Sequence, residues 1–193
     1  MDTQNPTLTN LINLALELGA THAAPLASAA IRTRAELAQS CTTCPNHGSS
    51  QGCPPHPGPP EFKRWKGEYP TALAVKMEVP MEILLSHQGR EIYSHLHTLM
   101  AQLEIRALES GIPRARAFAS GGCKQLFCGD HPNCAALNSG HCRHPEMARP
   151  SMSGYGVDVA HLLHLAGWQD ETQGLPDDKA PMGFACGLLL MAL

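Results

Sequence analysis

Seven of the eight cysteines in the sequence fall into two groups, and these are the residues best suited to chemistry. The first group has the pattern Cys41-x2-Cys44-x8-Cys53, and Pro54-Pro55 follows at once. A Cys-x2-Cys turn can direct two thiolates at one metal centre, and a third thiolate nearby completes a facial set. The proline after Cys53 is similar to the Cys-Pro step that closes many iron–sulfur binding runs. The first group therefore predicts three ligands of an iron–sulfur cluster.

Three thiolates leave one iron of a four-iron, four-sulfur (4Fe-4S) cluster without a ligand from this group. The sequence leaves open whether a residue elsewhere, an exogenous ligand or a substrate binds that iron. The candidates within the chain are Cys186, His47 and His56. Cys186 lies in an apolar run, Gly183-Phe184-Ala185-Cys186-Gly187-Leu188, which favours a place in the core over a place at a metal.

The second group, Cys123-x4-Cys128-x5-Cys134-x7-Cys142, supplies enough thiolates for a complete cluster. Its spacing matches neither ferredoxin pattern, and it lacks the paired Cys-x2-Cys knuckles of a zinc ribbon. The irregular gaps suit a cluster, whose ligands lie further apart than those of one tetrahedral ion. A 4Fe-4S cluster is therefore expected here, with structural zinc as the competing interpretation. Nearby histidines are expected to donate hydrogen bonds or face solvent, with replacement of a cysteine as the alternative: His131, His141 and His144.

Composition and charge narrow the class of protein. Of the 193 residues, 43% are hydrophobic and 16% are charged, which is typical of an ordered globular chain. The formal net charge of -3 and the absence of a basic run argue against a nucleic-acid partner. The first five residues lack the positive region of a secretory signal, and the apolar run 182–193 is far shorter than the roughly 20 residues of a membrane span. We therefore expect a cytoplasmic protein without a membrane partner, in which clustered reduced cysteines indicate metal or redox chemistry.

Periodicity predicts the elements that would position these cysteines. Helices are expected at residues 8–18, 34–38, over much of 81–110 and at 157–165, and strands at 23–31, 71–79, 115–119 and within 184–191. The stretches 41–60 and 121–150 are rich in proline and glycine and are expected to form irregular loops. The pattern favours a single α/β or α+β domain over residues 1–193, with a small mixed sheet, flanking helices and two irregular cysteine-rich metal loops.

Several short motifs extend beyond the cysteines themselves. They are Cys41-Thr-Thr-Cys44-Pro-Asn-His-Gly with Cys53-Pro-Pro, Cys142-Arg-His-Pro, Ala148-Arg-Pro-Ser-Met and Gly154-Tyr-Gly-Val-Asp-Val. In these the chain resembles a family of small prokaryotic proteins known only as predicted metal-binding proteins of unknown function. The resemblance spans most of the chain and implies metal binding without naming a reaction. It implies cysteine ligands at Cys41, Cys44, Cys53, Cys123, Cys128, Cys134 and Cys142.

Three functions stay open on these residues. The first is an electron-transfer or redox accessory protein that holds one or two 4Fe-4S clusters and meets a redox partner protein. The second is an enzyme in which the three-cysteine cluster keeps an open iron as a Lewis acid for a small-molecule substrate. The third is a structural zinc module or metal carrier. Whether the chain is an enzyme, and its oligomeric state, do not follow from the sequence.

Two arginines near the second group have two interpretations of similar weight. Arg143 and Arg149 could stabilise the negative charge of a thiolate cluster and receive an acidic partner or substrate. Alternatively, they form ordinary ion pairs with Glu146 or Asp158.

Overall fold

The computed structural model describes residues 5–56, 58–168 and 181–193, and its centre is a four-stranded sheet. In spatial order the strands are β1 (His22–Ala27), β2 (Thr71–Pro80), β4 (Met182–Met191) and β3 (Ala115–Phe118), and each neighbouring pair is antiparallel. The predicted fold class, α/β or α+β with flanking helices, is confirmed. The expected mixed sheet is wrong in one respect: β2 and β3 run the same way, but β4 inserts between them, so that all neighbouring strands are antiparallel.

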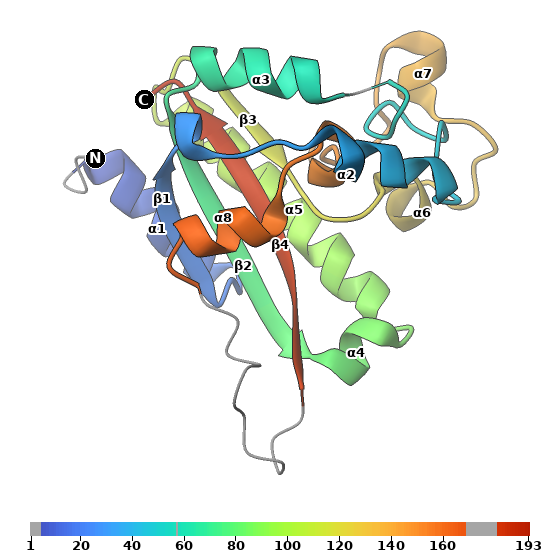
Figure 1. The fold of residues 1–193 in the computed structure, drawn as a ribbon, viewed down its shortest axis with the longest axis horizontal. Coiled ribbons are helices and arrows are strands. Elements are labelled where there is room, and N and C mark those ends of the chain that lie inside the picture. The colour runs from blue at the N-terminus through green and yellow to red at the C-terminus, as the bar shows by residue number, and fades with distance from the viewer. Residues whose placement is uncertain (1–4, 57, 169–180) are drawn as a thin grey trace.

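Helices cover both faces of the sheet (Figure 1). On one face lie α1 (Pro6–Glu17) and α5 (Gly89–Glu109), whose buried leucines join those of the strands in one core. On the other face lie α3 (Pro59–Glu68) and α8 (Val159–Leu165), which contribute to a second core. No helix among the described residues is both long and apolar enough to cross a bilayer.

Strand β4 shows how the sequence serves both cores. Its side chains alternate, so that Leu189 and Met191 join the α1–α5 core while Leu188 and Leu190 join the α3–α8 core. All four are fully buried. A run apolar at nearly every position is therefore required by a strand covered on both faces. Cys186, also on β4, is 2% exposed and belongs to the α3–α8 core, as its apolar surroundings predicted.

The predicted helices and strands are found, with three differences. The strand expected at 23–31 is shorter, because β1 ends at Ala27 and a 3-10 turn, η1 (Ser28–Ala30), follows it. Helix α3 is additional: it begins at Pro59 within the expected loop 41–60, because proline is favoured in the first turn of a helix. The long helix predicted within 81–110 is divided into α4 (Met81–Leu85) and α5. At the junction a Cβ on Gly89 would lie 2.2 Å from the carbonyl oxygen of Leu84, so only glycine allows this close turn.

The two cysteine loops gather at one end of the molecule (Figure 1). They are less irregular than expected, because short helices lie in or beside them. These are α2 (Ala35–Gln39) and the 3-10 turn η2 (Ser40–Thr43) at the first loop, and α6 (Cys123–Phe127) and α7 (Ala135–Ser139) within the second. A further 3-10 turn, η3 (Met152–Tyr155), follows the second loop.

Candidate metal centre

The three cysteines of the first loop line one cavity of about 310 Å³. Cys41 lies in η2 and Cys44 caps it, with the Cys44 N–H donating to the Cys41 carbonyl at 3.1 Å. Cys53 completes the set and is buried. His47 lines the same cavity, so the structure places one of the two candidate histidines beside these cysteines. The cavity is also lined by small residues of the second loop and its following segment: Gly121, Gly122, Ser151, Ser153 and Gly154.

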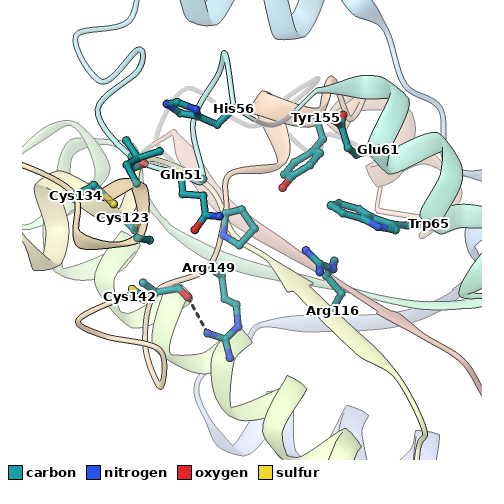
Figure 2. Close-up of a pocket in the computed structure, with 16 residues that line it drawn as sticks. Gln51, His56, Glu61, Trp65, Arg116, Cys123, Cys134, Cys142, Arg149 and Tyr155 are labelled. Atoms are coloured by element: carbon teal, nitrogen blue, oxygen red, sulfur yellow. Dashed lines mark hydrogen bonds between the residues drawn. The ribbon is translucent and has the colours of Figure 1, made fainter. Parts of the chain in front are cut away.

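Three cysteines of the second loop line another cavity, of about 580 Å³ (Figure 2). Cys123 begins α6 and Cys134 is the N-cap of α7, so each lies where a short helix starts. Cys142 accepts a hydrogen bond at its sulfur from the His144 N–H, at 3.4 Å. His56, the second candidate histidine, lines this cavity and not that of the first loop.

Cys128 is set apart from the other predicted ligands. It caps the C-terminal end of α6, and its carbonyl accepts a hydrogen bond from the Lys124 ammonium group at 2.8 Å. It lines neither cavity. The structure thus brings the predicted ligands together as two groups of three. Within the described residues, no group of three or more His, Cys, Asp or Glu side chains is arranged to hold a single metal ion.

The two loops meet directly at Gly52. Its carbonyl accepts a hydrogen bond from the Ser151 N–H at 3.4 Å, and a Cβ on Gly52 would lie only 3.0 Å from the Cα of Pro150. Next to this contact lies Ser50, which is 1% exposed. Burial raises the pKa of both Cys53 and Cys123, and the Ser50 hydroxyl opposes that rise at each thiol. That hydroxyl makes no regular hydrogen bond with any described residue. Such a buried group is costly unless a ligand satisfies it, which fits a site that binds a metal group at the thiols.

The thiols influence one another across the loops. Burial raises the pKa of Cys41, and the charges of Cys44 and Cys53 raise it further. Burial likewise raises the pKa of Cys123 to about 11, with contributions from Cys53, Cys142 and Cys134. Because each thiolate makes its neighbours harder to ionise, the set can be fully ionised only when a cation compensates the charge. The residues therefore fit a positively charged metal group.

Cys134 differs from the other thiols. Burial raises its pKa, but hydrogen bonds from the backbone N–H groups of Gln51, Leu137 and Ala136, together with the charge of Arg143, lower it on balance. Gln51 belongs to the first cysteine loop, so an amide of one loop stabilises a thiolate of the other. Cys134 is thus prepared to act as the first thiolate of its group.

The two arginines near the second group have different roles. Arg143 acts on Cys134, and its guanidinium also donates to the Asn133 carbonyl at 3.0 Å. Arg149 is 8% exposed and pairs with Glu104 of α5 at 3.0 Å, rather than with Glu146 or Asp158. The interpretation as a thiolate partner therefore suits Arg143, and the interpretation as an ion pair suits Arg149 with a different partner.

A histidine outside the predicted set holds both ends of the second loop. His97 of α5 is fully buried, and its Nε2 lies 3.1 Å from the Ser120 carbonyl oxygen. Its Nδ1 accepts a hydrogen bond from the Arg149 N–H, also at 3.1 Å. This pattern fixes the neutral tautomer with the proton on Nε2. Burial lowers the pKa of His97 to about 4, and the charge of Arg149 acts in the same direction.

Neither Ser50 nor His97 was a predicted site residue. A buried histidine could have been suspected from its position next to Leu96 in the apolar stripe of a helix, but its partners lie more than twenty residues away in sequence. No local signal marks Ser50, because its importance comes from the meeting of the two loops.

A family model described as "Predicted metal-binding protein (DUF2284)" matches residues 24–190. No curated protein and no solved structure gave a significant match. The matched range includes all eight cysteines and both cavities. The chain therefore belongs to this family of predicted metal-binding proteins, whose function is unknown.

Proposed function

We propose that this protein binds two 4Fe-4S clusters and acts in electron transfer or as a redox accessory protein of the cytoplasm. The observation that carries the proposal is the division of six cysteines into two groups of three, each lining its own cavity. The first cluster would be held by Cys41, Cys44 and Cys53, and the second by Cys123, Cys134 and Cys142.

The spacing of the cysteines favours clusters over single zinc ions. A tetrahedral zinc site needs four ligands within about 2.0–2.3 Å of one ion, so their donor atoms crowd together. The described residues form no such group, although six thiols face the two cavities. A cavity of about 310 Å³ has roughly ten times the ~30 Å³ that one water occupies in the liquid, which is room for a multi-atom group.

The chain's own residues are suited to holding and tuning clusters. When bound, iron–sulfur clusters supply one-electron transfer at a potential set by charge and by hydrogen bonds to sulfur. Backbone N–H groups already point at Cys134 and Cys142, and Arg143 lies close enough to lower the pKa of Cys134. The charges of Cys53, Cys123 and Cys134 act on one another, so the two sites are near neighbours. Electrons could therefore pass between them and on to a redox partner protein.

A second candidate is an enzyme, and the larger cavity favours it. Only three cysteines face each cavity, which leaves one iron of each cluster without a cysteine from that group. The cavity beside Cys123, Cys134 and Cys142 has about 580 Å³, which falls in the size range of small-molecule sites. A small substrate there could reach an open iron. For the first cluster, His47 is the neighbouring side chain that could fill the open position.

The test is anaerobic purification with iron, sulfide and zinc quantified beside a visible absorption spectrum. Two clusters correspond to roughly eight irons and eight sulfides per chain. Cys53→Ala and Cys142→Ala should each remove about half of the iron. Cys186→Ala is the control, because Cys186 is buried like Cys53 but belongs to a hydrophobic core, and it should keep all the iron. Colourless protein with zinc and no sulfide, even when iron is supplied, would refute the proposal and select a zinc module or carrier.

Cys128→Ala and His47→Ala then separate the two candidate functions. If Cys128→Ala keeps its full iron content, Cys128 is not a ligand. The second cluster then has an open iron, and the enzyme is favoured. If Cys128→Ala loses the second cluster, the loop closes a four-cysteine site and electron transfer is favoured. His47→Ala makes the same distinction at the first site. Both variants are also tested for reversible one-electron reduction, which electron transfer requires.

A further inference from the structure

The large cavity has two unlike walls. Figure 2 shows Cys123, Cys134 and Cys142 on one side and Arg116, Trp65 and Tyr155 on the other. The second wall comes from β3, α3 and η3, which lie outside both cysteine loops. Holding a cluster would require none of these three side chains, so their presence at the cavity calls for a separate explanation.

Arg114 and Arg116 lie two residues apart in sequence, but only Arg116 lines the cavity, and the two differ in their partners. Arg114 lies over the ring of Tyr69 at 5.4 Å and also pairs with Glu68 at 3.5 Å. Arg116 lies over the ring of Trp65 at 4.1 Å, but within the described residues no carboxylate is at ion-pairing distance from it. The indole face holds the guanidinium in place. Among the described residues, none pairs with Arg116 or accepts a hydrogen bond from its N–H groups, so its charge is available to a ligand.

Tyr155 places a second donor at the same cavity. Its hydroxyl points into the space between the two walls (Figure 2). Burial raises the pKa of Tyr155 to about 12, so the phenol keeps its proton throughout the physiological range and can donate it in a hydrogen bond. The lining also contains an acid, Glu61, in the first turn of α3. Its Oε2 lies beside Gly58, the N-cap of that helix, where the helix dipole stabilises a carboxylate.

Part of the remaining lining is apolar, which suits an organic molecule better than a bare inorganic ion. The apolar lining residues are Ala136, Leu137, Ala148 and Pro150. A planar guanidinium fork recognises a carboxylate through two parallel hydrogen bonds, and a phenol can add a third. An apolar body attached to that carboxylate would extend across the cavity towards the cysteines.

We propose that this cavity binds a small organic carboxylate, with the carboxylate held by Arg116 and Tyr155 and the remainder directed at Cys123, Cys134 and Cys142. The binding itself depends only on the chain's own residues. The further statement that the ligand faces an iron–sulfur cluster rests on the proposed function.

The test is calorimetric titration of anaerobically purified holoprotein with benzoate, with benzamide and inorganic phosphate as comparison probes. Saturable benzoate binding is expected. Arg116→Gln should weaken it at least tenfold, and Arg116→Lys should weaken it less, because lysine keeps the charge but loses the fork. Tyr155→Phe should weaken it severalfold. Arg114→Gln, at the matched stacked arginine outside the cavity, should leave binding unchanged.

The outcomes separate this inference from the proposed function. Three results would each overturn the carboxylate site. The first is equal benzoate binding in Arg116→Gln and Arg114→Gln, and the second is no saturable binding. The third is benzamide or phosphate binding as tightly as benzoate. Iron and sulfide are quantified on the same samples. Binding that depends on Arg116 in a protein without clusters would keep the site and refute the proposed function. A shift in the visible or electron paramagnetic resonance spectrum on adding benzoate would support the placement beside the cluster, and an unchanged spectrum despite binding would refute that placement.

Discussion

Replacing His97 by alanine should destabilise the whole protein and release the second cysteine loop in particular. His97 contacts both ends of that loop, because its ring bonds to Ser120, just before the loop, and to Arg149, near the loop's end. The substitution leaves the Ser120 carbonyl and the Arg149 N–H without this partner in a buried environment. It also leaves a cavity where the ring, in edge contact with Phe127 at 5.8 Å, had packed.

The expected loss can be worked out from these contacts. A buried donor or acceptor left unsatisfied costs about 1–3 kcal/mol. Two such groups lose their partner here, the Ser120 carbonyl and the Arg149 N–H. The free energy of unfolding should therefore fall by about 4 kcal/mol. The pH dependence adds a second signature, because the pKa of His97 is about 4 in the folded state and 6.5 ordinarily. As the pH falls below 6.5 the unfolded chain takes up a proton that the folded state refuses, so stability falls by about 3 kcal/mol on the way to pH 4.

The assay is urea unfolding under anaerobic conditions at several pH values between 7 and 4, followed by circular dichroism. His97→Gln can keep one donor and one acceptor but cannot titrate, so it should lose less stability at pH 7 and show a shallower decline towards pH 4. His95→Gln is the matched control, because His95 lies on the same helix but is exposed, and its ring contacts the Leu18 carbonyl rather than the second loop. Identical pH profiles for the wild type and His97→Gln would refute the assignment of the titrating group. Unchanged stability in His97→Ala would refute its role in holding the loop.

Three further changes test other parts of the structure. Gly156→Ala should lower stability by about 3 kcal/mol in thermal unfolding, because Gly156 has a φ of +68° and a Cβ there would lie 2.5 Å from the Arg34 carbonyl oxygen; an unchanged melting temperature would contradict the close approach. Arg149→Met should cost about 3–5 kcal/mol in urea unfolding, because it leaves the Glu104 carboxylate without its charged partner at 3.0 Å. Partly restored stability in the double variant with Glu104→Gln, which removes the charge but keeps an acceptor for the Ala117 N–H, is the check on that reason. Iron loading should release protons and strengthen from pH 6.5 to 8.5, because Cys123 has a pKa of about 11 and must lose its proton to bind; loading independent of pH would argue against thiolate ligation.

The sequence predicted the elements better than their meeting points. Alternation and helical periodicity are local properties, so β2, β4 and α5 could be located from their own residues. Helix α3 was missed because its apolar residues, Phe62 and Trp65, follow a proline-rich stretch that also fits a loop. The antiparallel order depends on the last strand inserting between two earlier ones, and no local pattern encodes that choice.

The candidate site shows the same division in physical terms. The cysteines could be singled out because thiols are chemically distinctive and grouped in sequence. Spacing alone could not separate Cys128 from its neighbours, since its distance from them depends on how α6 folds and on the bond between its carbonyl and Lys124. Nor could spacing identify Arg116, whose significance arises because no described carboxylate pairs with it, whereas Arg114 pairs with Glu68.

The contact between the loops decides how the two sites can work together. Had the loops been independent, each would bind its metal group with its own affinity and the thiol pKa values of one would not depend on the other. Instead, burial raises the pKa of Cys53 and the charge of Cys134 raises it further, while the single hydroxyl of Ser50 acts on thiols of both groups. Filling one site neutralises thiolates that oppose ionisation in the other, so occupation of the first site should favour occupation of the second. The glycine at position 52, which lets the backbone approach Pro150, is therefore as much a part of the site as the cysteines themselves.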